Sequence, residues 1–131
     1  MCIRDRATLN DRVYDEGLST LVSEADRIDI CSSEPTTYSQ ATTSGSVSLG
    51  NKTSITLTGP ADGDTSGRKV TVPQITGGSV TAGGTATHFA ISDTSGSGRL
   101  LVTGSLSSSQ SVSSGNSFSL TTLDIEIPDP S

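Results

Sequence analysis

Aromatic residues are scarce in this sequence, and tryptophan is absent. Two tyrosines and two phenylalanines make up 3% of the 131 residues, and hydrophobic residues of all kinds make up only 31%. A surface that stacks sugars or bases needs several exposed rings, and three of these four rings are readily assigned to a core. Tyr38, in a polar stretch, is the ring that we single out for ligand contact. So thin a core is typical of a β-sandwich whose outer faces carry serine, threonine and glycine.

Positive charge and long apolar runs are also scarce. Eight Lys and Arg residues against 14 Asp and Glu give a formal net charge of −6, whereas a phosphate-binding surface needs clustered cations. No apolar run approaches the roughly 18 residues that span a bilayer, and no signal-peptide core follows the N-terminus. The sequence therefore predicts a protein made in the cytoplasm that binds neither nucleic acid nor membrane. A charged fraction of 17% also argues against partial disorder, which the low hydrophobicity would otherwise favour.

Motifs for catalysis and cofactor binding are missing as well. The sequence contains no Walker loop, no dinucleotide fingerprint and no G-x-S-x-G elbow. Its two cysteines, Cys2 and Cys31, are far apart, and Cys31 is expected to be a free, buried thiol. We therefore assign no catalytic residue, metal or cofactor, and predict that the protein is not an enzyme.

The N-terminal region divides into a short excluded segment and a helix. Residues 1–6, MCIRDR, resemble translated sequencing-adapter sequence of the kind found at the starts of reading frames from assembled metagenomes. We therefore exclude this segment and predict that residues 7–131 form one β-sandwich domain. Over about residues 10–25, apolar side chains recur at three- and four-residue spacings, which predicts one amphipathic helix. These side chains are Val13, Tyr14, Leu18, Leu21, Val22 and Ala25.

A hairpin over residues 85–106 is the clearest feature of the remaining chain. Two runs, 85–92 and 99–106, flank the turn sequence DTSGSG at 93–98. Strict alternation predicts that Thr87, Phe89 and Ile91 share one face and that Ala86, His88 and Ala90 share the other. In the second run, the same rule places Leu100, Val102 and Leu106 together, with Leu101 opposite them.

Other short strands are predicted at spacings near ten residues. They are residues 28–32, 52–58, 68–73, 117–120 and 123–127, and residues 110–112 are paired with 117–120 in a second hairpin across SSGN. The polar stretch at 36–51 reads as a mobile loop with a short strand around Val47 and Leu49. This pattern predicts a mainly β fold, an antiparallel β-sandwich of jelly-roll or immunoglobulin-like type, with one short N-terminal α-helix.

Five residues are the candidates for ligand or interface contacts. Asp62 and Asp64 offer oxygen ligands at i and i+2, but no bidentate Glu follows them, so a role in the turn is the stronger interpretation. Asp93 is interpreted in the same way. His88 lacks a Cys or second His for a zinc site and lacks a Ser–Asp partner set, so a structural role is favoured. Tyr38 completes the set.

Several stretches carry a family resemblance. They are ICSSEP at 30–35, ATHFAISD at 86–93 with its glycine turn and Leu100-Leu101, Ser105-Leu106, and VSSGN at 112–116. Together they resemble small virion proteins of tailed bacteriophages, described as tail-fibre-like or minor tail proteins, over most of residues 10–128.

The resemblance implies a structural role in the virion and supplies no catalytic residues. It implies a tail, fibre or head-decoration protein that assembles with other virion proteins, and for a fibre-like piece we expect a homotrimer. Such a protein is made in the cytoplasm of the bacterial host and ends in the virion. The alternative is a carbohydrate-binding or adhesive β-sandwich module that uses Tyr38 and the Asp-rich turns.

Overall fold

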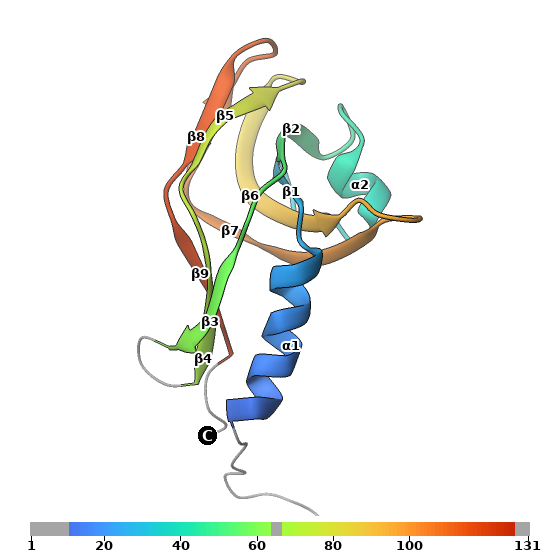
Figure 1. Cartoon of the computed structure of the whole chain (residues 1–131). Coiled ribbons are helices and arrows are strands. Elements are labelled where there is room, and N and C mark those ends of the chain that lie inside the picture. Colours follow the sequence, from blue (N-terminus) through green and yellow to red (C-terminus); the bar gives the residue numbers. More distant parts are fainter. Residues whose placement is uncertain (1–10, 64–66, 128–131) are drawn as a thin grey trace, which may run out of the picture.

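The computed structural model describes residues 11–63 and 67–127, and the side chains within these ranges from Asp15 onward. Strands dominate the described part (Figure 1). Its elements in chain order are α1 (Asp11–Glu24), β1 (Arg27–Cys31), α2 (Tyr38–Thr42), β2 (Ser48–Thr53), β3 (Thr58–Asp62), β4 (Arg68–Val72), β5 (Ile75–Val80), β6 (Gly84–Asp93), β7 (Arg99–Val112), β8 (Ser117–Leu120) and β9 (Leu123–Ile127). The mainly β prediction is confirmed.

Two antiparallel sheets make up the fold. The larger has the strand order β7-β6-β1-β2-β5-β8, and the smaller has the order β3-β4-β9. Figure 1 shows the larger sheet curling strongly, so that its two edges come round toward one another. The predicted hairpin is β6 and β7, joined through residues 94–98. The curled, sandwich-like arrangement confirms the predicted fold class.

One long antiparallel ribbon connects the two sheets. Val72 on β4 lies opposite Leu123 on β9, and Ile75 on β5 lies opposite Leu120 on β8. On each strand these positions are three residues apart, so the register continues unchanged from one sheet into the other. Among the described residues, β8 pairs only with β5 and β9 only with β4, so the two strands form one nearly continuous free edge.

Helix α1 packs beside the smaller sheet, against β3 and β4. Its buried side chains Leu18 and Leu21 lie on the predicted stripe, as does buried Ala25 directly after the helix, which confirms the helical period. The side chains of Val13 and Tyr14 lie outside those described. The Arg68 guanidinium on β4 donates to both carboxylate oxygens of Asp15, at 2.8 and 3.4 Å, and fixes the helix to the sheet. Burial of the apolar stripe stabilises this helix more than its own propensity does.

Glycines face the aromatic rings of the thin core. A Cβ at Gly104 would lie 2.7 Å from the Phe89 ring, and one at Gly78 would lie 2.4 Å from the Phe118 ring. In both cases the glycine and the ring are cross-strand partners. With so few large side chains, each phenylalanine covers the backbone of its partner strand and fills the space that a second side chain would otherwise occupy.

Two strand predictions are wrong because the strands pair with partners that are distant in the sequence. The predicted strand 52–58 is divided, since β2 ends at Thr53 and β3 begins at Thr58, with Ile55 and Leu57 buried in the connection. The predicted hairpin between 110–112 and 117–120 is not formed. Instead, residues 110–112 continue β7 and pair with β6, while β8 pairs with β5.

The predicted loop at 36–51 contains more structure than its polarity indicated. Thr37 caps helix α2, its side chain accepting from the Gln40 backbone N–H at 3.1 Å, and β2 starts at Ser48. Ala41 on α2 is fully buried against Cys31 and Ala90, on the outer face of the larger sheet. Small buried side chains, not a long apolar run, hold this segment in place.

Strict alternation fails on both strands of the β6–β7 hairpin. Ala86 packs in the main core cluster and not on the opposite face. On β7, Leu101 packs against the main core together with Val102 and Leu106, and not opposite them, while Leu100 packs in the small cluster. The ladder between β6 and β7 shifts register next to Ala86 and again next to Leu100. A bulge turns the side chains on one side of it to the other face of the sheet.

Candidate functional site

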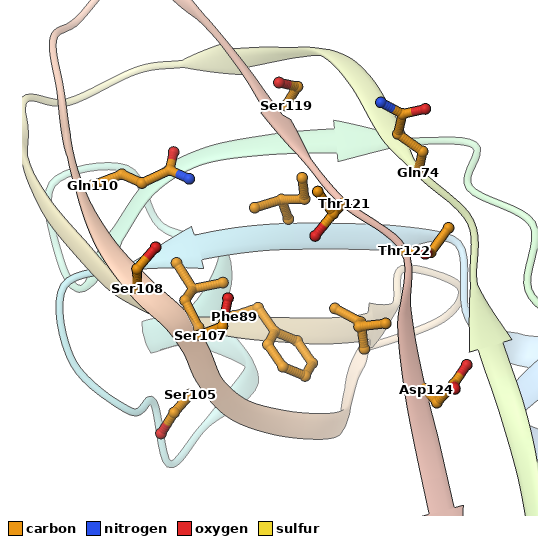
Figure 2. A pocket seen from close by; sticks show the side chains of 13 residues that line it. Gln74, Phe89, Ser105, Ser107, Ser108, Gln110, Ser119, Thr121, Thr122 and Asp124 are labelled. Carbon is orange, nitrogen blue, oxygen red and sulfur yellow. The ribbon is translucent and has the colours of Figure 1, made fainter. Parts of the chain in front are cut away.

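A groove with a volume of about 540 Å³ lies between β7 and the β8–β9 edge. Figure 2 shows the Phe89 ring in the groove between these two segments, with polar side chains along both of them. Its lining residues come from strands at opposite edges of the curled sheet and from the β4–β5 connection. They are Gln74, Phe89, Ser105, Leu106, Ser107, Ser108, Gln110, Ser119, Leu120, Thr121, Thr122, Leu123 and Asp124.

The groove lies where β7 bulges away from its partner. Ala86 on β6 lies opposite Gln110, and His88 lies opposite Ser105. Two steps along β6 therefore correspond to five steps along β7, and the register gives residues 106–109 no partner on β6. This excess length bends β7 outward. The result is a stretch of strand that is out of register with its neighbour.

The other wall is built by alternation along β8. Phe118 and Leu120 are buried, while Ser117 and Ser119 are exposed, as the period of two requires. Thr121 and Thr122 then connect β8 to β9. In the part of the chain that the structure describes, β8 pairs only with β5, so the edge that it turns toward β7 presents free backbone N–H and C=O groups.

The groove is almost free of charge. The sequence has no Asp, Glu, Lys or Arg from Leu100 to Leu123, and Asp124 is the one charged residue that lines the groove. The carboxylate of Asp124 is held by Lys69 at 3.2 Å and by the Thr71 hydroxyl at 2.9 Å, both on β4. Hydroxyl, amide and backbone groups over an apolar floor can bind a ligand by hydrogen bonds and burial.

The residues singled out from the sequence lie elsewhere. Tyr38, at the start of α2, is half-buried and packs on Gly98, where a Cβ would be 2.3 Å from its ring. Asp93 is buried at the end of β6 and accepts from the Ser95 N–H at 2.9 Å and the Ser95 hydroxyl at 2.6 Å. These two residues are brought to the same turn, each stabilising its conformation. A role in ligand contact stays a prediction for both.

Asp62 and His88 are placed far from this turn and from each other. Asp62, exposed on β3, pairs with Arg68, the residue that also binds Asp15. His88 is half-buried on β6, and its Nδ1 lies 2.8 Å from the Thr87 hydroxyl, which in turn donates to the Ser32 carbonyl at 2.9 Å. Asp64 lies outside the described residues. Neither Asp62 nor His88 lines the groove.

Sequence reasoning missed a buried ion pair. Asp29 on β1 is fully buried and accepts from the Arg27 guanidinium at 2.7 and 3.0 Å and from the Ser48 hydroxyl at 2.7 Å. Arg27 also donates to the Thr42 carbonyl at the end of α2 at 3.0 Å. Burial raises the pKa of Asp29, and the hydrogen bonds from Arg27 and Ser48 oppose this shift. The available signal was Arg27 two residues before Asp29, which places both on one face of a strand.

Cys31 follows this pair on β1 and is fully buried and free, as the sequence predicted. Burial, with a smaller contribution from the Asp29 charge, raises the pKa of its thiol to about 12. The thiolate is the reactive form of cysteine, so Cys31 is chemically inert in the folded protein.

The turn at Asp93 predicts a pH dependence of stability. The Ser95 side-chain and backbone hydrogen bonds hold the pKa of Asp93 below its ordinary value. The stability that ionised Asp93 contributes is therefore fully present above its unfolded-state pKa, about 3.9, and is lost as the pH falls through the lower folded-state pKa. We expect the urea midpoint of the wild type to fall more steeply than that of Asp93→Asn between pH 5 and the acid limit. Parallel pH profiles of the two proteins would contradict this assignment.

The described residues hold neither a cluster of metal ligands nor a membrane-spanning helix. Within these ranges, no three His, Cys, Asp or Glu side chains gather where they could hold a metal ion. None of the described helices is long and apolar enough to cross a membrane.

Comparison with known proteins gives one result. Residues 19–128 match the model of the family described as podophage GP4 fiber I protein gp80. No curated protein and no solved structure matches the chain. The family match spans most of the 131 residues and includes both sheets and the groove. The chain therefore belongs to the podophage GP4 fiber I protein family, and it is a structural protein of a phage fibre.

Proposed function

We propose that this fibre protein joins neighbouring virion proteins through the groove between β7 and the β8–β9 edge. A structural protein of a particle needs a surface that a neighbour can cover, and unpaired strand edges are the strongest such surface in a β fold. The family match supports a place in the virion. Synthesis in the host cytoplasm, proposed from the sequence, is consistent with that place.

A single observation carries this assignment to the groove. Residues 106–109 of β7 have no partner in the register with β6, and the β8 edge across the groove pairs only with β5 in the described chain. Native proteins usually protect long edges with lysine, proline or a covering segment. Here β7 is 14 residues long, and the chain has no Lys, Arg or Pro between Leu100 and Leu123. An unprotected edge of this length is suited to pairing with another protein.

Incorporation of variants into particles tests the proposal. Ser107→Lys places a charged side chain on a lining residue of the groove, and its matched control, Ser19→Lys, changes an exposed serine of α1 that lies on neither edge strand of the groove. In a podophage whose own copy of the gene carries an amber codon, we expect Ser107→Lys to reduce incorporation about tenfold or more, since charge at an edge opposes pairing. The Ser19→Lys protein should be incorporated like wild type.

Immunoblots of purified particles measure the incorporated protein, and circular dichroism shows that both variants fold. Equal incorporation of wild type and Ser107→Lys would show that this groove is not the assembly surface. The expected homotrimer is tested separately by sedimentation of the purified wild-type chain. A monomer or a dimer would contradict that expectation.

The alternative function, a carbohydrate-binding module, has one observation in its favour. Hydroxyl and amide groups line the groove, among them Gln74 and Gln110, and such groups bind sugar hydroxyls. However, Phe89 is only 7% exposed, so its ring face is not available for stacking. Binding of soluble oligosaccharides to the isolated wild-type protein, lost in Ser107→Lys, would favour this alternative over assembly.

A further inference from the structure

The two walls of the groove are the opposite edges of one sheet. The strands β7 and β8 follow one another in the chain, joined by residues 113–116, yet β7 pairs with β6 and β8 pairs with β5. Because all neighbouring pairs in the six-stranded sheet are antiparallel, β7 and β8 also run in opposite directions. The curled sheet thus leaves an open seam between its two edge strands, and a strand placed in the seam would extend both edges.

The floor of the seam determines what such a strand would present to it. Phe89 lies between the two walls (Figure 2), Leu120 and Leu123 also contribute apolar lining, and serine and threonine hydroxyls lie along both walls. An extended segment turns every second side chain to one face. Apolar side chains that face the floor would stabilise binding through their burial, whereas small polar side chains are suited to the outward face.

The charge of the seam restricts the occupant further. No charged residue occurs from Leu100 to Leu123, and the carboxylate of Asp124 already has partners in Lys69 and Thr71. A charged side chain directed into this seam would lose its hydration without gaining an ionic partner, which is strongly unfavourable. The neutral seam is therefore complementary to a neutral segment.

We propose that the groove accepts an uncharged β-strand, donated by another virion polypeptide, with an apolar side chain at every second residue. This inference rests on the proposed assembly function and states the chemistry of the partner. The donated strand runs antiparallel to β7, the longer free edge, because antiparallel pairing is slightly more stable. It is then parallel to β8, since β7 and β8 run in opposite directions.

Binding of a synthetic peptide to the full chain tests this inference. The probe is a labelled, end-blocked seven-residue peptide of alternating threonine and valine, and the control peptide has lysine in place of each valine. Fluorescence anisotropy should show saturable binding of the probe to wild type and to Ser19→Lys. We expect binding at least about tenfold weaker for the control peptide and for Ser107→Lys, equivalent to about 1.4 kcal/mol.

Hydrogen exchange locates the bound peptide. Slower exchange in residues 105–112 and 117–122 on addition of the probe supports insertion into the seam, while protection confined to β3 or α1 overturns it. Equal binding of the lysine peptide overturns the requirement for a neutral strand. If the probe does not bind but Ser107→Lys still fails to enter particles, the strand inference is wrong and the assembly surface stands. If Ser107→Lys enters particles normally, the proposed function itself fails.

Discussion

Replacing Asp29 with alanine is expected to lower the free energy of unfolding by about 3 kcal/mol, because removal of one partner from a buried ion pair leaves the other charge uncompensated. The carboxylate is fully buried and accepts three hydrogen bonds, two from Arg27 and one from Ser48. The Arg27 side chain keeps 18% exposure, so some hydration remains possible and the loss lies at the lower end of the usual 3–5 kcal/mol. Urea unfolding followed by circular dichroism measures it.

Two variants separate the ion pair from its surroundings. Ser48→Ala removes one hydrogen bond to the carboxylate and should lower the free energy of unfolding by at most about 1.5–3 kcal/mol. The double variant Arg27→Met with Asp29→Leu removes both charges, and an apolar pair of similar volume is often neutral, so it should be more stable than Asp29→Ala. A double variant less stable than Asp29→Ala would contradict this explanation, as would an Asp29→Ala protein of wild-type stability.

Phe89→Ala should lower the free energy of unfolding by about 3–5 kcal/mol, the range for truncating a buried phenylalanine to alanine. The ring is 7% exposed, belongs to the main core cluster and forms the floor of the groove. A thin core has few other large side chains that could fill the cavity. Thermal and urea unfolding of the variant measure the loss.

The neighbouring glycine provides a matched second change. A Cβ at Gly104 would lie 2.7 and 2.8 Å from two atoms of the Phe89 ring, so Gly104→Ala alone should destabilise by about 1–3 kcal/mol through overpacking. Once the ring is gone, the added methyl group enters empty space. We therefore expect the loss of stability in the double variant Phe89→Ala with Gly104→Ala to be clearly smaller than the sum of the losses in the two single variants. Additive losses would show that the glycine is not required by the ring.

The period of the apolar residues was sufficient to predict several elements. Leu18, Leu21 and Ala25 recur at helical spacing, and all three side chains are buried, the first two on α1 and Ala25 directly after it. Leu123 and Ile125 alternate with acidic residues in the strand that became β9. The glycine-rich sequence at 93–98 predicted the position of the turn between β6 and β7. These signals are local, because each depends on residues within one turn of helix or a few positions of strand.

Other features depend on residues that are distant in the sequence. Ser117–Leu120 follows residues 110–112 across a tight turn, and only the tertiary structure shows that it pairs with β5 instead. The excess length of β7 opposite Ala86 and His88 is a property of the register between two strands, which neither strand encodes alone. Asp29, between two isoleucines, reads as a solvent-facing position until α2 and Ser48 are placed over it.

The sequence by itself thus determined the strand-rich class, the helix, the central hairpin and the neutral stretch from Leu100 to Leu123. Side-chain period, turn chemistry and charge need no knowledge of distant contacts. The tertiary structure decided which strand edges stay open, because strand pairing is a choice among partners far apart along the chain. The neutral stretch becomes a groove only because β7 and β8 pair away from each other, at opposite edges of the same curled sheet.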